Sequence, residues 1–316
     1  MLALVVVACA TPEPSPSDAP GSADPSGSGW QPGPEAPVSL IEGATAVHDG
    51  RIWIAGGLTA GGEAVDSVVV LDPATGEWTE GPALPEQVHH SALVSDGEDL
   101  WLLGGYVGAS FDAPTDAVRR LPGGDPAGTW QSAPALPERR AAGAAVWDGT
   151  RIVYGGGVGP GVISDLVFAL GADGAFGAVA RLSRSREHLA AASDGEGRTF
   201  FLGGRQGGLT SNLSRVDVVA GDTSEVVGEM PSSRGGVAAF WWPALGACML
   251  GGEAPDRAYR DVECITPDGA TSTQPGMLVP RHGFGAGVVD GTAYAVLGGP
   301  DPGLTVSSTT ETLALP

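Results

Sequence analysis

A pair of adjacent glycines recurs along this chain at nearly constant spacing, and each pair follows a short apolar run. The six doublets are Gly56-Gly57, Gly104-Gly105, Gly155-Gly156, Gly203-Gly204, Gly251-Gly252 and Gly298-Gly299. Their first glycines lie 48, 51, 48, 48 and 47 residues apart. Helical solenoids repeat at about 33 or 34 residues, whereas propeller blades need about 40 to 50. The period therefore predicts an all-β chain of six blades, each with four strands.

The residues around the doublets agree with strands and tight turns. The run before the first doublet, at 51–55, is Arg-Ile-Trp-Ile-Ala, rich in β-branched and aromatic residues as a buried strand should be. Asp-Gly pairs stand before five of the six runs, and Asp-Gly tolerates the positive φ of a hairpin turn. We expect these turns at Asp49-Gly50, Asp96-Gly97, Asp148-Gly149, Asp194-Gly195 and Asp290-Gly291.

One repeat shows a longer pattern. After the first doublet, residues 68–78 form an apolar strand that ends in Leu-Asp-Pro-Ala-Thr-Gly-Glu-Trp, and Ala83-Leu84-Pro85 follows. This resembles the kelch repeat, as in the central domain of galactose oxidase, over residues 30–316. The resemblance implies a six-bladed kelch-type β-propeller. Later repeats depart from the pattern, because Val226 and Thr273 stand where the tryptophan is expected.

The two ends of the repeat region complement each other. After Gly299 only 17 residues remain, enough for a third strand at 305–313 but for no fourth. The missing segment stands at 30–37, which matches residues 78–85 from its tryptophan to its proline. We expect the N-terminal strand to complete the last blade and cover its open edge.

The residues before Trp30 resemble an export signal followed by a flexible linker. Residues 1–8 begin an apolar export-like segment, and Val6-Val7-Ala8-Cys9 resembles a bacterial lipobox, which predicts lipid attachment at Cys9. Residues 9–29 are rich in Pro, Ser, Ala and Gly and predict a disordered linker. We expect an exported protein, lipid-anchored at a bacterial cell envelope, that contacts the membrane only through this anchor.

Composition excludes several functional classes. The sequence has no lysine, which removes phosphate-loop, kinase-type and Schiff-base lysines. A net charge of −21 argues against nucleic acid as a partner. Motifs for nucleophilic hydrolases and zinc proteases are also missing. We expect no cofactor, no bound metal and a monomer.

Two cysteines fall within one predicted blade. Cys248 lies three residues before its doublet, in a second strand, and Cys264 lies in the neighbouring third strand. An exported protein meets an oxidising compartment, where a cross-strand disulfide forms if the side chains are directly opposite. The sequence leaves a disulfide and two buried thiols equally open.

Basic residues gather where the chain leads into the first strand of a blade. Six-fold geometry would bring them together around one mouth of the central opening, as a basic collar for an acidic ligand. The loops after the second strands would add further residues to this mouth. An Arg at this place in kelch repeats also braces the scaffold, and that alternative stays open. The candidate ligand-binding residues are His89, His90, Tyr106, Arg139, Arg140, Arg186, His188, Arg205, Arg234, Glu253, Tyr259, Arg281 and His282.

Three functions follow from the repeat scaffold and its resemblance. The first is a binding or interaction module for an acidic glycan or peptide, with no catalytic residue. The second is a carbohydrate-active enzyme of the sialic-acid epimerase (mutarotase) type, with Glu253, His188, His90 and the arginines as acid–base candidates. The third is a copper enzyme like galactose oxidase, which would need Tyr and His ligands and a Tyr cross-linked to a Cys.

Overall fold

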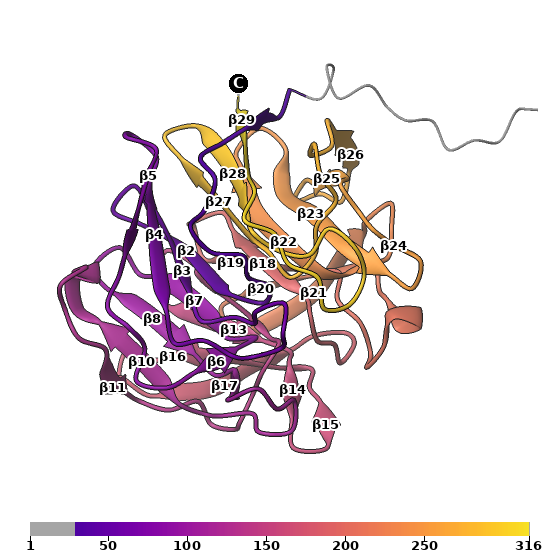
Figure 1. Ribbon diagram of the computed structural model, residues 1–316. Helices are drawn as coiled ribbons and strands as arrows, with labels where there is room; N and C mark the ends of the chain where they lie inside the picture. The colour runs from indigo at the N-terminus through magenta and orange to yellow at the C-terminus, as the bar shows by residue number, and fades with distance from the viewer. Residues whose placement is uncertain (1–28, 316) are drawn as a thin grey trace, which may run out of the picture.

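The computed structural model describes residues 29–315 and consists of six antiparallel four-stranded sheets arranged around one axis (Figure 1). The all-β class and the six blades predicted from the glycine period are confirmed. Blade 1 is β2 (Ala44–His48), β3 (Arg51–Ala55), β4 (Val68–Asp72) and β5 (Glu77–Glu80). Blade 2 is β7 (Ala92–Ser95), β8 (Leu100–Leu103), β10 (Val118–Leu121) and β11 (Gln131–Ala133). Blade 3 is β12 (Ala144–Trp147), β13 (Ile152–Gly155), β16 (Leu166–Leu170) and β17 (Phe176–Arg181).

The remaining blades follow the same order from axis to rim. Blade 4 is β18 (Ala190–Ser193), β19 (Arg198–Leu202), β20 (Arg215–Ala220) and β21 (Thr223–Glu229). Blade 5 is β22 (Gly235–Trp242), β23 (Gly246–Ala254), β25 (Val262–Ile265) and β26 (Thr271–Gln274), with β24 (Arg257–Ala258) paired to the end of β23. Blade 6 is β27 (Gly285–Val289), β28 (Thr292–Val296), β29 (Thr310–Ala314) and β1 (Gln31–Pro32).

Short elements lie between the blade strands. β6 (Val88–His89) pairs with β9 (Tyr106–Val107), and β14 (Val158–Gly159) pairs with β15 (Val162–Ile163). Two single-turn 3-10 helices, η2 (Pro122–Gly124) and η3 (Leu209–Ser211), lie in loops. Within residues 29–315, no helix has the length and apolar character needed to cross a membrane. The predicted signal segment, Cys9 and almost all of the predicted linker lie outside the described residues.

Strand composition follows distance from the axis. The second strands β3 and β8 are almost wholly buried, whereas the outer strand β5 is mostly exposed. The innermost strands are rich in Ala and Gly, as in β12, β18 and β27, because six strands converge there and leave little room for side chains. The apolar core therefore lies mainly between the faces of adjacent blades.

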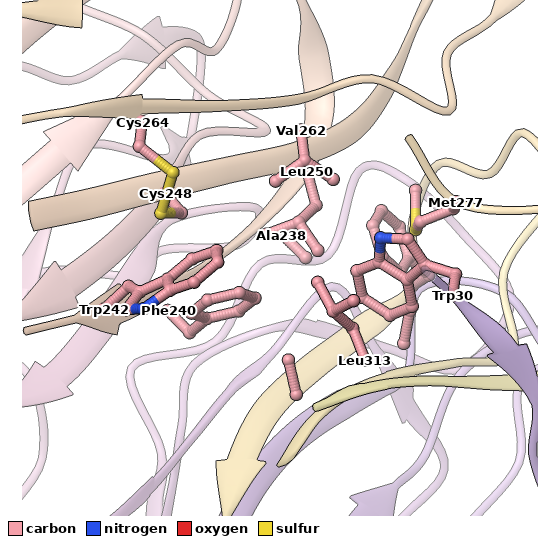
Figure 2. Close-up of a cluster of buried hydrophobic side chains, with 13 residues drawn as sticks. Trp30, Ala238, Phe240, Trp242, Cys248, Leu250, Val262, Cys264, Met277 and Leu313 are labelled. Carbon is pink, nitrogen blue, oxygen red and sulfur yellow. A yellow bond between two sulfur atoms is a disulfide. The ribbon is translucent and has the colours of Figure 1, made fainter. Parts of the chain in front are cut away.

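The ring closes as predicted. The innermost strand β27 of blade 6 contacts β2 of blade 1, and β1 pairs antiparallel with β29, with Gln31 opposite Thr312. Figure 1 shows the indigo N-terminal segment beside the yellow C-terminal strands. Trp30 is 1% exposed and packs in the core between blades 5 and 6, near Met277 and Leu313 (Figure 2).

Trp30 takes the same place in its blade as two other tryptophans. Its Nε1 donates a hydrogen bond to the carbonyl of Pro275 in the preceding blade. The two equivalent bonds run from Trp78 to Pro34 and from Trp130 to Pro82. The match between residues 30–37 and 78–85 thus reflects one repeated contact between neighbouring blades.

Glycine pairs connect five of the six described blades to the next, and in blade 6 the equivalent pair is Leu297-Gly298. Gly57 N–H donates to the Val88 carbonyl and Gly105 N–H to the Arg140 carbonyl. A Cβ on the preceding residue, Gly56 or Gly104, would lie 2.4 or 2.3 Å from that same carbonyl oxygen. Both glycines also have positive φ, so no other residue fits without strain. In blade 3 the equivalent pair is Gly156-Gly157, one residue later than predicted, because Gly155 still belongs to β13.

Blade 5 contains the disulfide. Cys248 on β23 and Cys264 on β25 are directly opposite, with Cα atoms 4.0 Å apart, and their sulfur atoms are bonded (Figure 2). Both residues are fully buried. Of the two states that the sequence left open, the structure has the cross-strand disulfide.

Candidate functional site

Six residues form a closed ring of backbone hydrogen bonds around the axis. Five of them lie two residues before the innermost strand of their blade, and the sixth, Gly236, is the second residue of β22. Each N–H donates to the carbonyl of the equivalent residue in the preceding blade, over N–O distances of 2.7–3.0 Å. The central ring consists of Glu42, His90, Ala142, His188, Gly236 and Gly283.

All six ring residues have positive φ, between 52° and 66°. Glycine adopts this conformation freely, whereas Glu42, His90, Ala142 and His188 are strained in it. The closed circle of hydrogen bonds holds the backbone in this conformation, whatever the side chain. Its positions therefore carry side chains on a fixed frame at the centre of the molecule.

Three side chains of the central ring meet on the axis. His90 Nε2 lies 3.0 Å from His188 Nε2. The Glu42 carboxylate lies 3.5 Å from His90 Nε2 and 3.8 Å from His188 Nε2. We call Glu42, His90 and His188 the axial trio.

Burial keeps the trio close to neutral. It raises the pKa of Glu42 to about 7 and lowers the pKa of His90 to about 3. Burial also lowers the pKa of His188 well below its usual value, with nearby positive charges acting in the same direction. The neighbouring His89 has its pKa lowered to about 4, again mainly by burial. At neutral pH these imidazoles are uncharged, so each has one ring nitrogen with a free lone pair.

A network of charged groups lies beside the trio, on the face where the chain enters the innermost strands. Glu187 accepts a hydrogen bond from His188 Nδ1 and forms an ion pair with Arg205 at 2.9 Å. Arg205 also bonds to Glu253 at 2.8 Å, and Glu253 lies 3.4 Å from His282 Nε2. Both carboxylates are nearly buried, so the guanidinium group between them is held in one orientation.

These groups line two neighbouring hollows. The mouth pocket, of about 460 Å³, is lined by Tyr106, Glu187, His188, Arg205, Glu253 and loop residues around them. A channel cavity of about 160 Å³ is lined by the central ring and the residues that follow it on the innermost strands. His188 borders both hollows, whereas Glu42 and His90 line the channel cavity.

Comparison with known proteins identifies the architecture. A family model for the kelch motif matches residues 42–85, which is blade 1 with its connections. A solved structure described as "Structure of YjhT" superposes with a TM-score of 0.75 at 12% identity, over 88% of this chain and 95% of that one. This chain is a six-bladed β-propeller with a kelch motif in its first blade. At such low identity the likeness concerns the fold alone, and no curated protein matches the propeller in sequence.

The propeller does not have the expected basic collar. Arg140, Arg186, Arg234 and Arg281 are at most 1% exposed and do not converge on the mouth. Each binds a carboxylate instead, in the pairs Arg140–Glu138, Arg186–Asp217, Arg234–Glu263 and Arg281–Glu311. The scaffold alternative describes them correctly.

The bracing contact repeats in three blades. Arg281 donates to the carbonyls of Leu297 and Thr309, and its partner Glu311 accepts the backbone N–H groups of Leu278 and Val279. Arg186 with Asp217 and Arg234 with Glu263 make the same kind of link. Each pair ties the incoming loop to the second and third strands of its own blade.

The other predicted residues divide between the mouth and the periphery. Seven of them lie together at the mouth, namely His89, His90, Tyr106, His188, Arg205, Glu253 and His282. Arg139 is exposed. Tyr259 lies in a separate groove with Arg257 and Arg260, its ring beneath the guanidinium group of Arg234.

Sequence analysis missed Glu42, Glu187 and Phe111. Phe111 is 59% exposed and packs against Tyr106 and His89 at the rim of the mouth. Glu42 could have been found by register, since it stands 14 residues before Gly56 just as His90 stands 14 before Gly104. For Glu187 and Phe111 the sequence carries no comparable signal.

Proposed function

We propose that the propeller is a binding module that takes a small, hydroxyl-rich ligand, such as a sugar, in the mouth pocket. The observation that carries this proposal is the Glu187–Arg205–Glu253 network, which lines a pocket of about 460 Å³. Preorganised donors and acceptors in a concave site are typical of small-molecule binding. Sugar hydroxyl groups both donate and accept, so they match a surface that offers carboxylate and guanidinium groups side by side.

The charge of the mouth favours a neutral ligand over the acidic one expected from the sequence. That expectation depended on arginines that are buried and paired with carboxylates. The network at the mouth has two carboxylates against one guanidinium. An anionic ligand would meet more negative than positive charge there.

An aromatic wall completes the site. Tyr106 is buried in the pocket lining, and the exposed Phe111 stands 5.6 Å from it, measured between ring centroids. The apolar face of a sugar ring packs well on such a surface, and an exposed aromatic side chain is a common contact in binding sites. The wall also explains why a large apolar side chain stays exposed at this position.

The test is a glycan array followed by calorimetry of any hit. Glu253→Gln and Arg205→Gln should each weaken binding at least tenfold, because one partner of the network loses its charge. Arg139→Gln, at an exposed position outside the pocket, is the matched control and should bind as the wild type does. Binding that survives both pocket substitutions would place the ligand elsewhere.

A second candidate is acid–base chemistry on a bound sugar. Glu187 and Glu253 flank Arg205 from two sides of one pocket, and paired carboxylates serve as general acid and base in many sites. Exchange of sialic-acid anomers, followed by NMR with and without the protein, tests the mutarotase type. Equal exchange rates in both samples would rule out the mutarotase activity, and the binding role would be the only one of the two left.

The galactose oxidase type has no support from the described residues. Cys248 and Cys264 are joined to each other, so neither can be cross-linked to a tyrosine. Tyr106 and Tyr259, the two tyrosines predicted near the mouth, lie in different hollows. They could not ligate one copper ion together.

We also propose that the propeller is carried at the cell envelope through lipid on Cys9. The support is the sequence Val6-Val7-Ala8-Cys9 at the end of an apolar segment. Cells fed a labelled fatty acid should label the wild-type protein and not the Cys9→Ser variant. Label in both proteins, or in neither, would contradict the proposal.

A further inference from the structure

The axial trio brings together three metal-ligating groups from three different blades. One ligand atom from each of Glu42, His90 and His188 lies within 4.8 Å of the other two. The residues are 48 and 98 positions apart in the chain, so no ligand spacing could be seen in the sequence.

The trio is close to the size of a tetrahedral site. Zinc ligands at about 2.0–2.1 Å from the ion lie about 3.3–3.4 Å from one another in such a site. The two imidazole nitrogens are 3.0 Å apart, and the two oxygens of Glu42 lie 3.5 Å from His90 Nε2 and 3.8 Å from His188 Nε2, one oxygen to each ring. Rotation of the Glu42 carboxylate and a small separation of the two rings would place an ion between the three groups.

We propose that Glu42, His90 and His188 bind a divalent first-row transition-metal ion, of which Zn²⁺ fits best. Two imidazoles and one carboxylate are a donor set of open, three-ligand metal sites. A fourth position would face the channel cavity, where water or a ligand atom can complete the shell. This inference goes beyond the proposed sugar binding and does not depend on it.

Neighbouring side chains orient the imidazoles of His90 and His188 for metal binding. His188 Nδ1 is bonded to the Glu187 carboxylate, and His90 Nδ1 lies 2.6 Å from His89 Nδ1. A metal-binding imidazole usually donates its other N–H to such a partner, which fixes the tautomer that turns its lone pair to the ion. Without an ion, a neutral His90 that carries its proton on Nε2 and donates it to His188 Nε2 explains their 3.0 Å contact. When an ion binds, that proton would move to Nδ1 of His90, which faces His89 Nδ1.

The central ring provides both rigidity and space. Its backbone circle fixes the Cα positions of all three ligands. The other three ring positions hold Ala142, Gly236 and Gly283, whose small or absent side chains leave the centre of the ring open. A bulky residue at any of them would project into the place that the ion needs.

The experiment measures binding of Zn²⁺ and Co²⁺ to the tag-free propeller, by calorimetry and by the visible absorption of Co²⁺. His90→Gly and His188→Gly remove one ligand each. Glycine suits the positive φ of these positions and already occupies two of the six ring positions, so the variants should fold. Ala142→Gly is the matched control, because it makes a similar change in the same ring without removing a ligand.

We expect one equivalent of metal per chain, with the intense visible bands of tetrahedral Co²⁺. The control should bind equally well, and each histidine variant should lose at least 100-fold in affinity. Glu187→Gln should weaken binding about 10- to 100-fold through the orientation of His188. The proposal is overturned if the wild type binds neither ion, or if both histidine variants bind as the control does. The proposal of sugar binding is tested separately, by the array and calorimetry described above, and neither outcome of the metal experiment decides it.

Discussion

An arginine in the interior of a protein needs partners for its charge and for its N–H groups, because an unpaired buried charge is very costly. Arg234 shows how the repeat meets this need. Its guanidinium group bonds to the carbonyls of Gly251 and Asp261 and pairs with Glu263 at 2.8 Å. The sequence showed that arginines recur in the loop before the first strand of a blade. Whether such an arginine faces the interior or the mouth depends on its carboxylate partner, which for Arg234 is Glu263 on the third strand.

Replacing a buried arginine should therefore cost far more than replacing an exposed one. Arg234→Ala leaves Glu263 buried without its partner and should lower the free energy of unfolding by about 3–5 kcal/mol. Arg139→Ala, at an exposed position, should change it by no more than about 0.5 kcal/mol. Urea denaturation measures both values. Similar losses for the two variants would contradict the bracing role.

Aspartates in the hairpin turns are a second repeated device. Asp96, Asp148 and Asp194 each accept two backbone N–H groups of their own turn. The turns themselves were expected at the Asp-Gly pairs, because the positive φ of a hairpin turn follows from neighbouring residues alone. The hydrogen bonds of the aspartate side chains were not part of that expectation.

Asp194 should make stability depend on pH. Burial alone would raise the pKa of its carboxyl group, but hydrogen bonds from the backbone of Glu196 and from Arg198 lower the pKa overall. The ionised form is thus favoured in the folded state, and it adds to the free energy of unfolding above the ordinary Asp pKa of about 3.9. This stabilisation is lost as the pH falls through the lower pKa of the folded state.

Asp194→Asn should have a lower free energy of unfolding than the wild type at pH 6, and the difference between the two proteins should narrow toward pH 2. Urea titrations across this range measure the difference, and a constant difference would contradict the assignment.

At the scale of strands, the period of the glycine doublets predicted the number of blades and most of their positions. It located the blades because the glycines of each doublet occur at or next to the same contact between neighbouring blades. In blade 6 the pair at this contact is Leu297-Gly298, one residue earlier than the predicted doublet. The period placed the doublet of blade 3 one residue early, since three consecutive glycines hide the register there. Which residues line the mouth was harder to predict. Arg186 and His188 are only two positions apart in the chain, yet Arg186 is buried in the scaffold and His188 lies on the axis.

The disulfide should stabilise blade 5. It closes a loop with a sequence separation of 16, for which the restriction of the unfolded chain corresponds to about 3 kcal/mol. The double variant Cys248→Ala, Cys264→Ala should therefore lose about 2–4 kcal/mol in the free energy of unfolding. Denaturation with and without a reducing agent gives an independent measure. Wild-type stability that is unchanged on reduction would argue against the bond.

For the whole molecule, the decisive contact joins the first described strand to the last. β1 covers the edge of β29, and Trp30 fills the core between blades 5 and 6 (Figure 2). The sequence predicted this closure because the missing fourth segment of the last repeat stands before the first. It could not predict the axial trio, whose members meet only when the ring is complete.

Removing this contact should weaken the entire ring. A chain that begins at residue 38 lacks β1 and Trp30, and the loss of one buried tryptophan alone costs about 3–5 kcal/mol. A chain that begins at residue 29 keeps both and serves as the control. Differential scanning calorimetry should show a large drop in Tm for the shorter chain only. Equal melting temperatures would mean that the last blade is stable without its fourth strand.

The circle of backbone hydrogen bonds has a consequence for how such a molecule can change. Main-chain atoms alone fix the conformation at the six ring positions. Four residue types, Glu, His, Ala and Gly, stand there on the same backbone conformation. Mutation can therefore exchange the chemical groups at the hub one at a time while the architecture persists. These six positions form a natural set for a combinatorial library in which new chemistries are selected on an unchanged frame.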